Sequence, residues 1–246
     1  MRDTKRETFE DLAKKIDIYA DGVNPKNVEE LIKNYHVRGF TTNPTLMKDL
    51  GVKDYKTFAG EMLEKVSGYP VSFEVIADSL DEMERQARLL SSFSNNVYVK
   101  IPVTNTNKVT TSDLIRKLSQ EGVKINTTAV FTREQIDNLE NCFESGTPGI
   151  ISIFAGRIAN AGEDAKEYVH YAVKKFERFP NVRILWASPR EVYNLIEAIE
   201  SGAHIITMQE KLIKEAFKTI GKTLEVYSQE TVKMFYDDAN KAGYSL

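Results

Sequence analysis

The sequence contains few of the residues that build covalent or metal-bound frameworks. Its 246 residues include one cysteine, Cys142, and three histidines, His36, His170 and His204. A single cysteine excludes a disulfide within the chain, and three scattered histidines give little material for a zinc site. The low counts of glycine (13) and proline (7) exclude collagen-like repeats and argue against long disordered tracts. We therefore expect a folded protein without a metal centre.

The chain also lacks an excess of either charge and any long apolar run. It carries 33 Lys and Arg residues against 36 Asp and Glu residues, a formal charge of −3. A balance this close to neutral gives no general attraction to nucleic acid. No window approaches the roughly 18 unbroken apolar residues of a membrane helix, and residues 1–15 lack the apolar core of an export signal. We expect a cytoplasmic protein with neither a nucleic-acid nor a membrane partner.

What the sequence does contain is a regular alternation of two patterns. Apolar residues make up 41% of the chain and charged residues 28%, as in ordinary globular proteins. Short runs rich in β-branched and aromatic residues predict eight strands. These runs are 16–21, 39–43, 71–76, 97–103, 124–130, 150–155, 182–188 and 204–209. Amphipathic stretches between them predict helices, among them 25–36, 79–93, 107–122 and 189–202.

This order of elements favours one fold class. Strand starts lie about 22 to 33 residues apart, the size of one βα unit. Eight such units predict a (β/α)₈ TIM barrel, and the absence of a linker predicts one domain over residues 1–246. Residues 1–15 add an N-terminal helix, and residues 227–246 form a helical tail. An open doubly wound sheet is the alternative, but the turn after the first predicted strand lacks the GxGxxG motif typical of that fold.

Alternation along each strand predicts which side chains face the barrel axis. In 97–103, Val97, Val99 and Ile101 share an apolar face that belongs under the helices, so Lys100 points to the axis. The same reasoning sends one polar residue per strand inward near the C-terminal ends of seven strands. These residues are Asp21, Asn43, Glu74, Lys100, Thr128, Ser152 and Ser188.

Two of these assignments include apolar neighbours whose direction the structure can test. In 182–188, we expect Trp186 and Ser188 to face the axis, and Leu185 and Ala187 to face the helices. In 124–130, we expect Ala129 to face the helices.

A lysine and two carboxylates inside a barrel require an explanation. Charged side chains are almost never buried without a partner, and burying one costs several kcal/mol. A structural ion-pair network inside the barrel is one explanation. We favour an active site, because Lys100, Glu74 and Asp21 converge with four hydroxyl or amide side chains at the end where barrel enzymes work.

The chemistry that these groups support is Schiff-base chemistry. Burial disfavours the ammonium form of Lys100, and a free amine condenses with ketones or aldehydes. Glu74 and Asp21 are available to move protons at the imine and at the substrate hydroxyl. Hydroxyl and amide groups suit a polyhydroxylated substrate. Since the iminium is the electron sink, the reaction needs neither a metal nor a cofactor.

At this point the residues resemble a known family. The chain from Ile18 onward is similar to transaldolase, the Schiff-base enzyme of sugar phosphate metabolism, and most of all to its short-chain members, which include the fructose-6-phosphate aldolases. The motifs that carry the resemblance are YAD ending at Asp21, GFTTNPTLM at 39–47, FEV around Glu74, VKIPVT around Lys100, NTTAVF at 126–131, SIFAGRI at 152–158 and WASPR at 186–190. Each motif alone is weak evidence for the family, but seven motifs in the family's order are specific to it.

The resemblance implies catalytic roles residue by residue. Lys100 would form the Schiff base, and Asp21 would be the acid and base at the substrate hydroxyl beside the bond that breaks. Glu74 would activate a catalytic water that Thr128 helps to hold.

The resemblance also implies which residues contact the substrate. Substrate-binding residues would be Thr42, Asn43, Asn126, Ser152 and Phe154, and phosphate-binding residues would be Arg157, Ser188 and Arg190. Physical chemistry supports the second set, because a guanidinium binds phosphate through two hydrogen bonds and a helix starting near Ser188 would leave free backbone N–H groups. Surface ion pairs are the alternative role for the two arginines. The family leads us to expect an aromatic residue where this chain has Pro189.

Three functions compete within this resemblance. A transaldolase transfers a dihydroxyacetone unit from a ketose phosphate to an aldose phosphate, whereas the aldolase members release free dihydroxyacetone. The family's transaldolases carry Glu and Phe at the positions of Glu74 and Phe154, and its aldolases carry Gln and Tyr, so this chain favours transfer. A non-catalytic sugar-phosphate-binding barrel is the third possibility, since a fold alone does not define a function.

The helical tail predicts a partner. Val232, Phe235 and Tyr236 form an apolar stripe, and no further strand follows for this helix to cover. Packing back onto its own barrel is the alternative to packing on a neighbouring subunit. The resemblance implies a homo-oligomer, a pentamer or decamer, joined through this helix.

Overall fold

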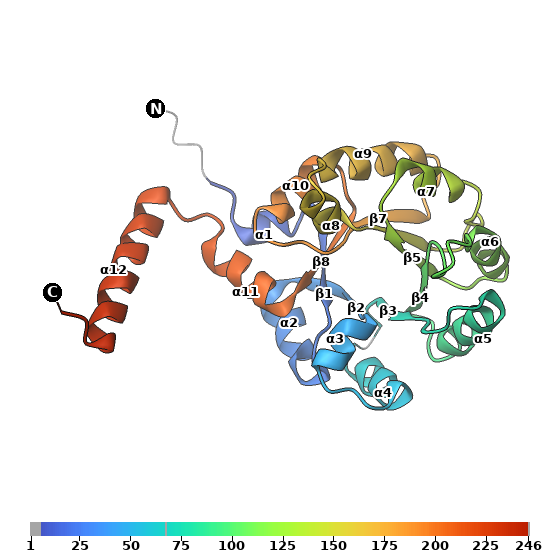
Figure 1. Cartoon of the computed structure of the whole chain (residues 1–246), viewed down its shortest axis with the longest axis horizontal. Coiled ribbons are helices and arrows are strands. Elements are labelled where there is room, and N and C mark those ends of the chain that lie inside the picture. The colour runs from blue at the N-terminus through green and yellow to red at the C-terminus, as the bar shows by residue number, and fades with distance from the viewer. Residues whose placement is uncertain (1–5, 67, 246) are drawn as a thin grey trace.

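Eight parallel strands close into a barrel in the computed structural model, which describes residues 6–66 and 68–245 (Figure 1). Each strand pairs with the next along the chain, and the last pairs with the first. The strands are β1 Asp17–Asp21, β2 Val37–Thr41, β3 Val71–Glu74, β4 Val97–Pro102, β5 Ile125–Val130, β6 Gly149–Ile153, β7 Val182–Trp186 and β8 Ile205–Gln209. The closed parallel barrel confirms the predicted fold class.

Helices surround the barrel between successive strands (Figure 1). The covering helices are α2 Val28–Tyr35, α4 Tyr55–Val66, α5 Leu80–Ser91, α6 Ser112–Gln120, α7 Arg133–Asn138, α9 Ala165–Phe176, α10 Asn194–Glu200 and α11 Glu210–Thr219. Shorter pieces are the 3₁₀ turn η1 Pro25–Asn27, α3 Pro44–Asp49 after β2 and α8 Ala155–Asn160 after β6. No helix of the described residues is long and apolar enough to cross a membrane.

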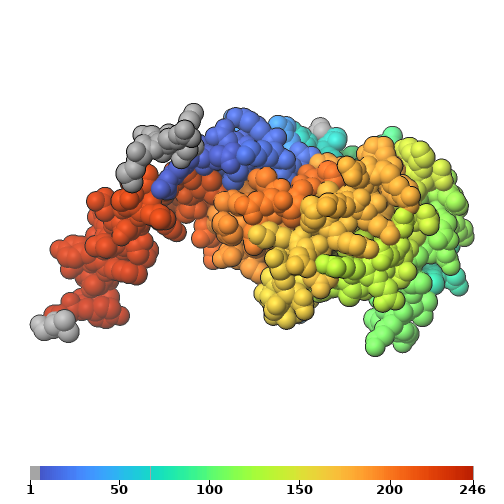
Figure 2. All heavy atoms as spheres, turned by 90° about the horizontal axis from the view of Figure 1, so that it is seen from above, coloured from blue at the N-terminus to red at the C-terminus, as the bar shows by residue number. Residues whose placement is uncertain are grey.

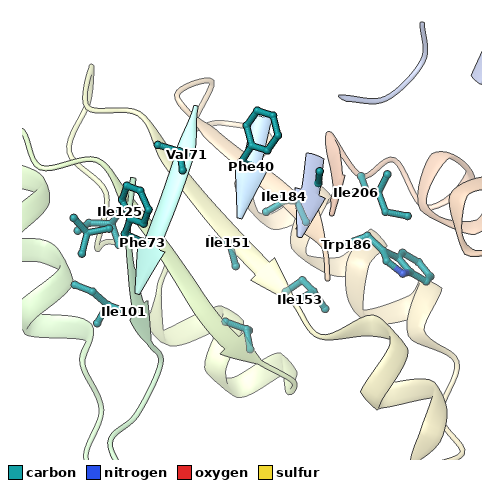
Figure 3. Close-up of a cluster of buried hydrophobic side chains, with 14 of the residues drawn as sticks. Phe40, Val71, Phe73, Ile101, Ile125, Ile151, Ile153, Ile184, Trp186 and Ile206 are labelled. Atoms are coloured by element: carbon teal, nitrogen blue, oxygen red, sulfur yellow. The ribbon is translucent and has the colours of Figure 1, made fainter. Parts of the chain in front are cut away.

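The main core lies between the strands and these helices. The outward faces of the strands supply branched and aromatic side chains such as Phe40, Phe73, Ile101 and Ile153, all fully buried (Figure 3). Burying one such side chain stabilises the fold by about 1.5–3 kcal/mol. The apolar outward face therefore explains why the polar members of each strand turn to the axis.

A second apolar cluster, here called the barrel floor, lies on the barrel axis, and all its members are in strands except Ala187, which directly follows β7. It consists of Tyr19, Ile150, Leu185, Ala187 and Ile205. Gly39 on β2 makes room for it, because a Cβ at that position would lie 2.5 Å from the ring of Tyr19. The floor closes the barrel below the site described next.

The expected direction of the β7 side chains was wrong. Leu185 and Ala187 belong to the barrel floor, whereas Trp186 packs in the outer core (Figure 3). Because both faces of β7 are buried, large apolar residues stand next to each other in its sequence. The two-residue alternation therefore did not show which of them faces the axis. Ser188 still reaches the mouth of the barrel, because its backbone turns into the left-handed region at φ 62°.

Ala129 does not follow the alternation either. Its φ is 58°, and the pairing of β5 with β6 shifts register between Thr127 and Val130. This bulge turns Ala129 toward the cavity at the mouth, whereas Val130 returns to the outer core.

Two predicted helices begin later than expected. Residues 107–111 are not helical: Thr104 bridges to Thr110, and the helix begins at Ser112, which agrees with the β-branched run at 109–111. The helix predicted over 189–202 begins at Asn194, after the left-handed Ser188.

The two terminal helices also differ from their expected bounds. α1 spans only Phe9–Leu12, capped by Thr8, and its buried Phe9 packs edge-on against Phe217 of α11. Residues 1–5 of the predicted N-terminal helix lie outside the described residues. The tail helix α12 spans Leu224–Ala242 and projects away from the barrel (Figures 1 and 2).

Candidate active site

A cavity of about 440 Å³ opens at the C-terminal ends of the strands, here called the mouth. Ten of the predicted site residues line it. They are Asp21, Asn43, Glu74, Lys100, Thr128, Ser152, Phe154, Arg157, Ser188 and Arg190. The barrel thus brings together residues that are separated by up to 169 positions in the sequence (Asp21 to Arg190).

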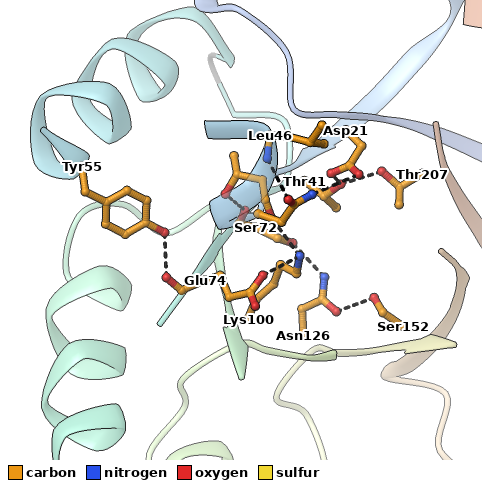
Figure 4. Close-up of polar contacts among 12 residues, drawn as sticks. Asp21, Thr41, Leu46, Tyr55, Ser72, Glu74, Lys100, Asn126, Ser152 and Thr207 are labelled. Atoms are coloured by element: carbon orange, nitrogen blue, oxygen red, sulfur yellow. Dashed lines mark hydrogen bonds and ion pairs between the residues drawn. The ribbon is translucent and has the colours of Figure 1, made fainter. Parts of the chain in front are cut away.

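Lys100 lies at the centre of the cavity wall, on β4. Its Nζ is 2.9 Å from Oε2 of Glu74 and donates to the backbone carbonyl of Thr42 at 2.7 Å (Figure 4). Glu74 pairs with Lys100 in the register of β3 and β4, and the lysine side chain is only 7% exposed. The carboxylate beside the amine can receive its proton, so the pair can supply a free amine when a substrate binds.

Asp21 ends β1 on another side of the same cavity. The Thr41 hydroxyl donates to its Oδ1 at 2.7 Å, and Nδ2 of Asn43 lies 3.4 Å from its Oδ2. Burial raises the pKa of Asp21 above its ordinary value, and the positive charge of Lys100 opposes that rise. A carboxyl group whose pKa is raised is better able to hold and release a proton near neutral pH.

Asn43 is held in place by the helix that follows it. Its side-chain oxygen accepts from the backbone N–H of Leu46, so Asn43 is the N-cap of α3, and Pro44 occupies the first position of that helix. The cap uses the amide oxygen and leaves the amide nitrogen directed at Asp21.

Thr42 and Asn126, which were predicted to bind substrate, do not line the cavity. The Thr42 hydroxyl donates to the backbone carbonyl of Ser72, and only its own carbonyl reaches Lys100. Asn126 is fully buried, donates to the Ser72 hydroxyl at 3.0 Å and accepts from the Ser152 hydroxyl at 2.7 Å (Figure 4). Both side chains are buried and are used in hydrogen bonds to neighbouring strands.

The Thr128 hydroxyl is available to a ligand. It is buried at the cavity wall on β5 and has no hydrogen-bond partner among residues 6–66 and 68–245. An unpaired buried hydroxyl costs free energy, and a water or substrate oxygen at this position would remove that cost.

Two exposed arginines give one side of the cavity a positive charge. Arg157 is on α8, with its guanidinium 5.7 Å from the ring centre of Phe154, and Arg190 follows β7 beside Pro189. The ion pairs that arginines form in the described residues involve Arg85, Arg88, Arg116, Arg133, Arg178 and Arg183. Neither cavity arginine is in that set, so both guanidinium groups are free to bind an anion.

A close backbone contact brings the two arginine segments together. Gly156 on α8 approaches Ser188 so closely that a Cβ would lie 1.7 Å from the Ser188 carbonyl oxygen. The backbone N–H groups of Arg190 and Glu191 are already occupied, because both donate to Oδ1 of Asn194. The predicted helix start at Ser188, with free N–H groups, is therefore wrong.

Sequence reasoning missed several polar side chains at the mouth, among them Thr41 and two residues of β8. The Thr207 hydroxyl on β8 lies 2.6 Å from the Thr41 hydroxyl, and Gln209 ends the same strand at the cavity wall. Alternation within 204–209, with Ile206 and Met208 in the outer core, would have placed both at the axis.

The described part of the chain contains no cluster of three or more His, Cys, Asp or Glu side chains with metal-binding geometry. The carboxylates that interact with the charge of Lys100 are Glu74, at 2.9 Å, and Asp21.

Comparison with known proteins places most of the chain in one family. The family described as transaldolase/fructose-6-phosphate aldolase matches residues 18–246. A protein named "Probable transaldolase" from Bdellovibrio bacteriovorus is 32% identical over 207 residues, which cover 84% of this chain and 89% of that protein. One of the same name from Thermoanaerobacter is 29% identical over 229 residues, covering 93% and 99%.

A solved structure supports the fold alone. Orotidine 5'-monophosphate decarboxylase from Metallosphaera sedula aligns with a TM-score of 0.53 at 14% identity, over 88% of this chain and 98% of that one. The family match, in contrast, includes all the cavity residues. It also includes every strand, apart from the first residue of β1. The chain therefore belongs to the transaldolase/fructose-6-phosphate aldolase family.

Proposed function

We propose that this protein is a transaldolase. It would move a dihydroxyacetone unit from a ketose phosphate, fructose 6-phosphate or sedoheptulose 7-phosphate, to an aldose phosphate. The observation that carries the proposal is the buried Lys100 amine, 2.9 Å from Glu74 and in the same cavity as Asp21. A lysine with two carboxylates is the set that Schiff-base formation and carbon–carbon cleavage require.

The first half of the reaction joins the lysine to the donor. The Lys100 amine attacks the ketone carbon, and the carbinolamine loses water to give an iminium ion. Glu74, through a water held by the free Thr128 hydroxyl, supplies and removes the protons of this step.

The second half breaks and forms the carbon–carbon bond. Asp21 takes the proton of the hydroxyl next to the bond, the bond electrons pass to the iminium as an enamine, and an aldose phosphate leaves. The enamine then adds to the acceptor aldehyde, and Asp21 returns its proton to the new hydroxyl.

The arginine side of the cavity supports a phosphorylated substrate. Arg157 and Arg190 are free of ion pairs in the described residues, and Ser188, two residues before Arg190, lines the cavity and contacts Gly156 beside Arg157. Guanidinium groups favour phosphate because they bind it through two parallel hydrogen bonds. We assign the phosphate to these three residues.

Two related functions are separated from this one by experiment. An aldolase would release free dihydroxyacetone, and a non-catalytic binding barrel would do neither reaction. With fructose 6-phosphate as donor, we expect transfer to erythrose 4-phosphate to be much faster than dihydroxyacetone release without it. Equal release with and without the acceptor would favour the aldolase, and no turnover in either assay would contradict the proposal.

We also propose that the protein is a homo-oligomer, a pentamer or decamer, joined through α12. No side chain of this helix is buried within its own chain, and Val232, Phe235 and Tyr236 are 66%, 64% and 68% exposed. A contiguous apolar stripe of this size is typical of an interface. The cytoplasmic location and the independence from metals, cofactors, nucleic acid and membranes stay predictions.

The assembly is tested by light scattering at micromolar concentration. The wild-type protein is expected to be a multimer of the 27.9 kDa chain, and the pair of changes Val232→Asp and Phe235→Asp is expected to give the monomer. Lys241→Glu, also exposed on α12, is the matched control and should leave the mass unchanged. A monomeric wild-type mass would contradict the proposal.

A further inference from the structure

A chain of hydroxyl groups leads to one oxygen of Asp21. The Thr207 hydroxyl on β8 lies 2.6 Å from the Thr41 hydroxyl on β2, which donates to Oδ1 of Asp21 at 2.7 Å (Figure 4). β1, which carries Asp21, lies between β8 and β2, so the chain crosses three neighbouring strands. Thr207 is 5% exposed and lines the cavity.

The direction of this chain follows from the number of protons available. A carboxylate only accepts hydrogen bonds, and a threonine hydroxyl has one proton to donate. When Asp21 is ionised, Thr41 gives its proton to Oδ1, so the bond between the two threonines must be donated by Thr207. Two donors in series then point at Oδ1.

The other oxygen of Asp21 is held far more loosely. The nearest donor to Oδ2 is Nδ2 of Asn43 at 3.4 Å, near the limit of a hydrogen bond. Asn43 cannot move closer without giving up its cap on α3, because its Oδ1 is bonded to the Leu46 backbone N–H.

We infer that Thr207 is a positioning residue that acts through Thr41 to keep Oδ1 of Asp21 as a hydrogen-bond acceptor and to leave Oδ2 as the oxygen that exchanges the substrate proton. The inference rests on the proposed function. In the cleavage step the substrate O–H bond breaks and an Oδ2–H bond forms, while Thr41 continues to donate to Oδ1. In the addition step the same proton returns, so the hydroxyl chain neither gains nor loses a proton.

The hydroxyl chain affects the titration of Asp21. Burial raises its pKa, Lys100 on β4 and the Thr41 donor lower it, and Glu74 on β3 raises it. Asp49 on α3, Arg157 on α8 and Arg190 after β7 also line the cavity. Donors to a carboxylate stabilise its ionised form, and a donor behind a donor strengthens that bond by about 10–30%.

Removing the Thr207 hydroxyl should therefore raise the pKa of Asp21 further. Thr207→Val keeps the shape of the side chain and removes the donor. In a plot of kcat/KM against pH, the acidic limb is the rise in activity as Asp21 loses its proton. We expect the pKa of this limb to increase by about 0.2–0.7 unit, because Thr207 strengthens the hydrogen bond from Thr41 to a charged carboxylate. Thr41→Val, which removes the direct donor, should move it further, and Thr207→Ser should restore the wild-type limb.

A purely structural role for Thr207 predicts a different pattern. It would lower thermal stability in Thr207→Val without moving the acidic limb, since packing does not depend on the charge of Asp21. The measurement is kcat/KM for fructose 6-phosphate with excess erythrose 4-phosphate across the acidic pH range, together with the melting temperature of each variant. If Thr207→Val does not fold, Thr207→Ala tests the same hydroxyl at smaller volume.

The outcomes separate this inference from the function on which it rests. Borohydride quenching of the wild-type enzyme with fructose 6-phosphate reports Schiff-base formation independently of Thr207. A trapped adduct together with an acidic limb that is unmoved or lowered in both Thr207→Val and Thr207→Ala would overturn the inference alone. An absence of adduct in the wild type would overturn the proposed function and this inference with it. An acidic limb that moves to higher pH in Thr207→Val and stays at its wild-type position in Thr207→Ser supports both the inference and the proposed function.

Discussion

On β1, β6 and β8, the inward-facing side chains of the barrel floor are apolar, whereas those two residues further along, at the mouth, are polar or ionisable. β1 passes from Tyr19 to Asp21, and β6 passes from Ile150 to Ser152. One step of two residues, about 7 Å along a strand, changes the interior from a packed core to a charged cavity.

The difference shows that the two ends of one barrel serve different purposes. The floor buries apolar surface on the axis and adds to stability in the ordinary way. The mouth places a lysine and two carboxylates around one cavity, which a core selected for stability alone would avoid. Changes at the floor should therefore affect stability first, and changes at the mouth should affect chemistry first.

The largest effect is expected at Lys100. Lys100→Arg retains the positive charge but cannot form an imine, so turnover should fall by about 10³-fold or more with the fold intact. Lys124→Arg is the matched control, because Lys124 precedes β5 at the floor end, where it donates to the Asn95 carbonyl. Steady-state kinetics and circular dichroism check both variants, and Lys100→Arg activity within tenfold of wild type would contradict the Schiff base.

The contrast is sharpest along β6, where one substitution can be made at each end. Ile150→Ala removes a floor side chain that is 1% exposed and should destabilise the protein by about 2–5 kcal/mol, with kcat of the folded enzyme nearly retained. Ser152→Ala removes the hydroxyl bonded to Asn126. Compared with Ile150→Ala, it should lower kcat/KM more and the free energy of unfolding less. Urea unfolding and kinetics on the same samples measure both, and the reverse ranking would break the comparison.

The arginine side of the mouth should affect binding more than the chemical step. Arg190→Gln removes one charge from the proposed phosphate site, so KM for fructose 6-phosphate should rise by about 10–100-fold with a smaller change in kcat. Arg178→Gln, in an exposed ion pair with Glu140, is the control and should leave KM unchanged. An unchanged KM in Arg190→Gln would place the phosphate elsewhere.

The smallest effect is a pH-dependent gain of stability at Asp21. Because burial raises its pKa in the folded state, the native protein binds this proton more tightly than the unfolded chain does. The resulting stabilisation is complete below the ordinary value of 3.8 and is lost as pH rises through the folded-state pKa.

Asp21→Asn removes this dependence. The variant should melt a few degrees above wild type near pH 8, since about 1 kcal/mol corresponds to about 2–4 °C, and the gap should narrow toward pH 4. Differential scanning calorimetry over that range measures it. A gap that stays constant with pH would show that Asp21 does not titrate as described.

Much of this contrast could be predicted from the sequence. On most strands the outward face is apolar and the inward face is not, so alternation alone placed Asp21, Glu74 and Lys100 at the axis. The same rule failed on β7, because Leu185 and Trp186 are neighbours of similar hydrophobicity on a strand that is buried on both faces.

Alternation along a strand predicts the direction of a side chain, but it does not predict whether that side chain reaches the cavity. Thr42 and Asn126 were expected to contact substrate, but neither lines the cavity, and both are hydrogen-bonded to neighbouring strands through Ser72 and Ser152. Contacts between strands that are distant in sequence, such as Thr207 with Thr41, depend on closure of the barrel. No local sequence pattern predicts them. The close approach of Gly156 to the Ser188 carbonyl is likewise a property of the closed structure.

The proposed chemistry depends on Lys100 as the nucleophile of the mouth. The most direct measurement is borohydride reduction in the presence of fructose 6-phosphate, followed by mass mapping of the peptides. We expect one stable sugar adduct, on the peptide that contains Lys100, which is absent in Lys100→Arg and retained in Lys124→Arg. The absence of any adduct, or an adduct on a different lysine, would contradict the proposed chemistry.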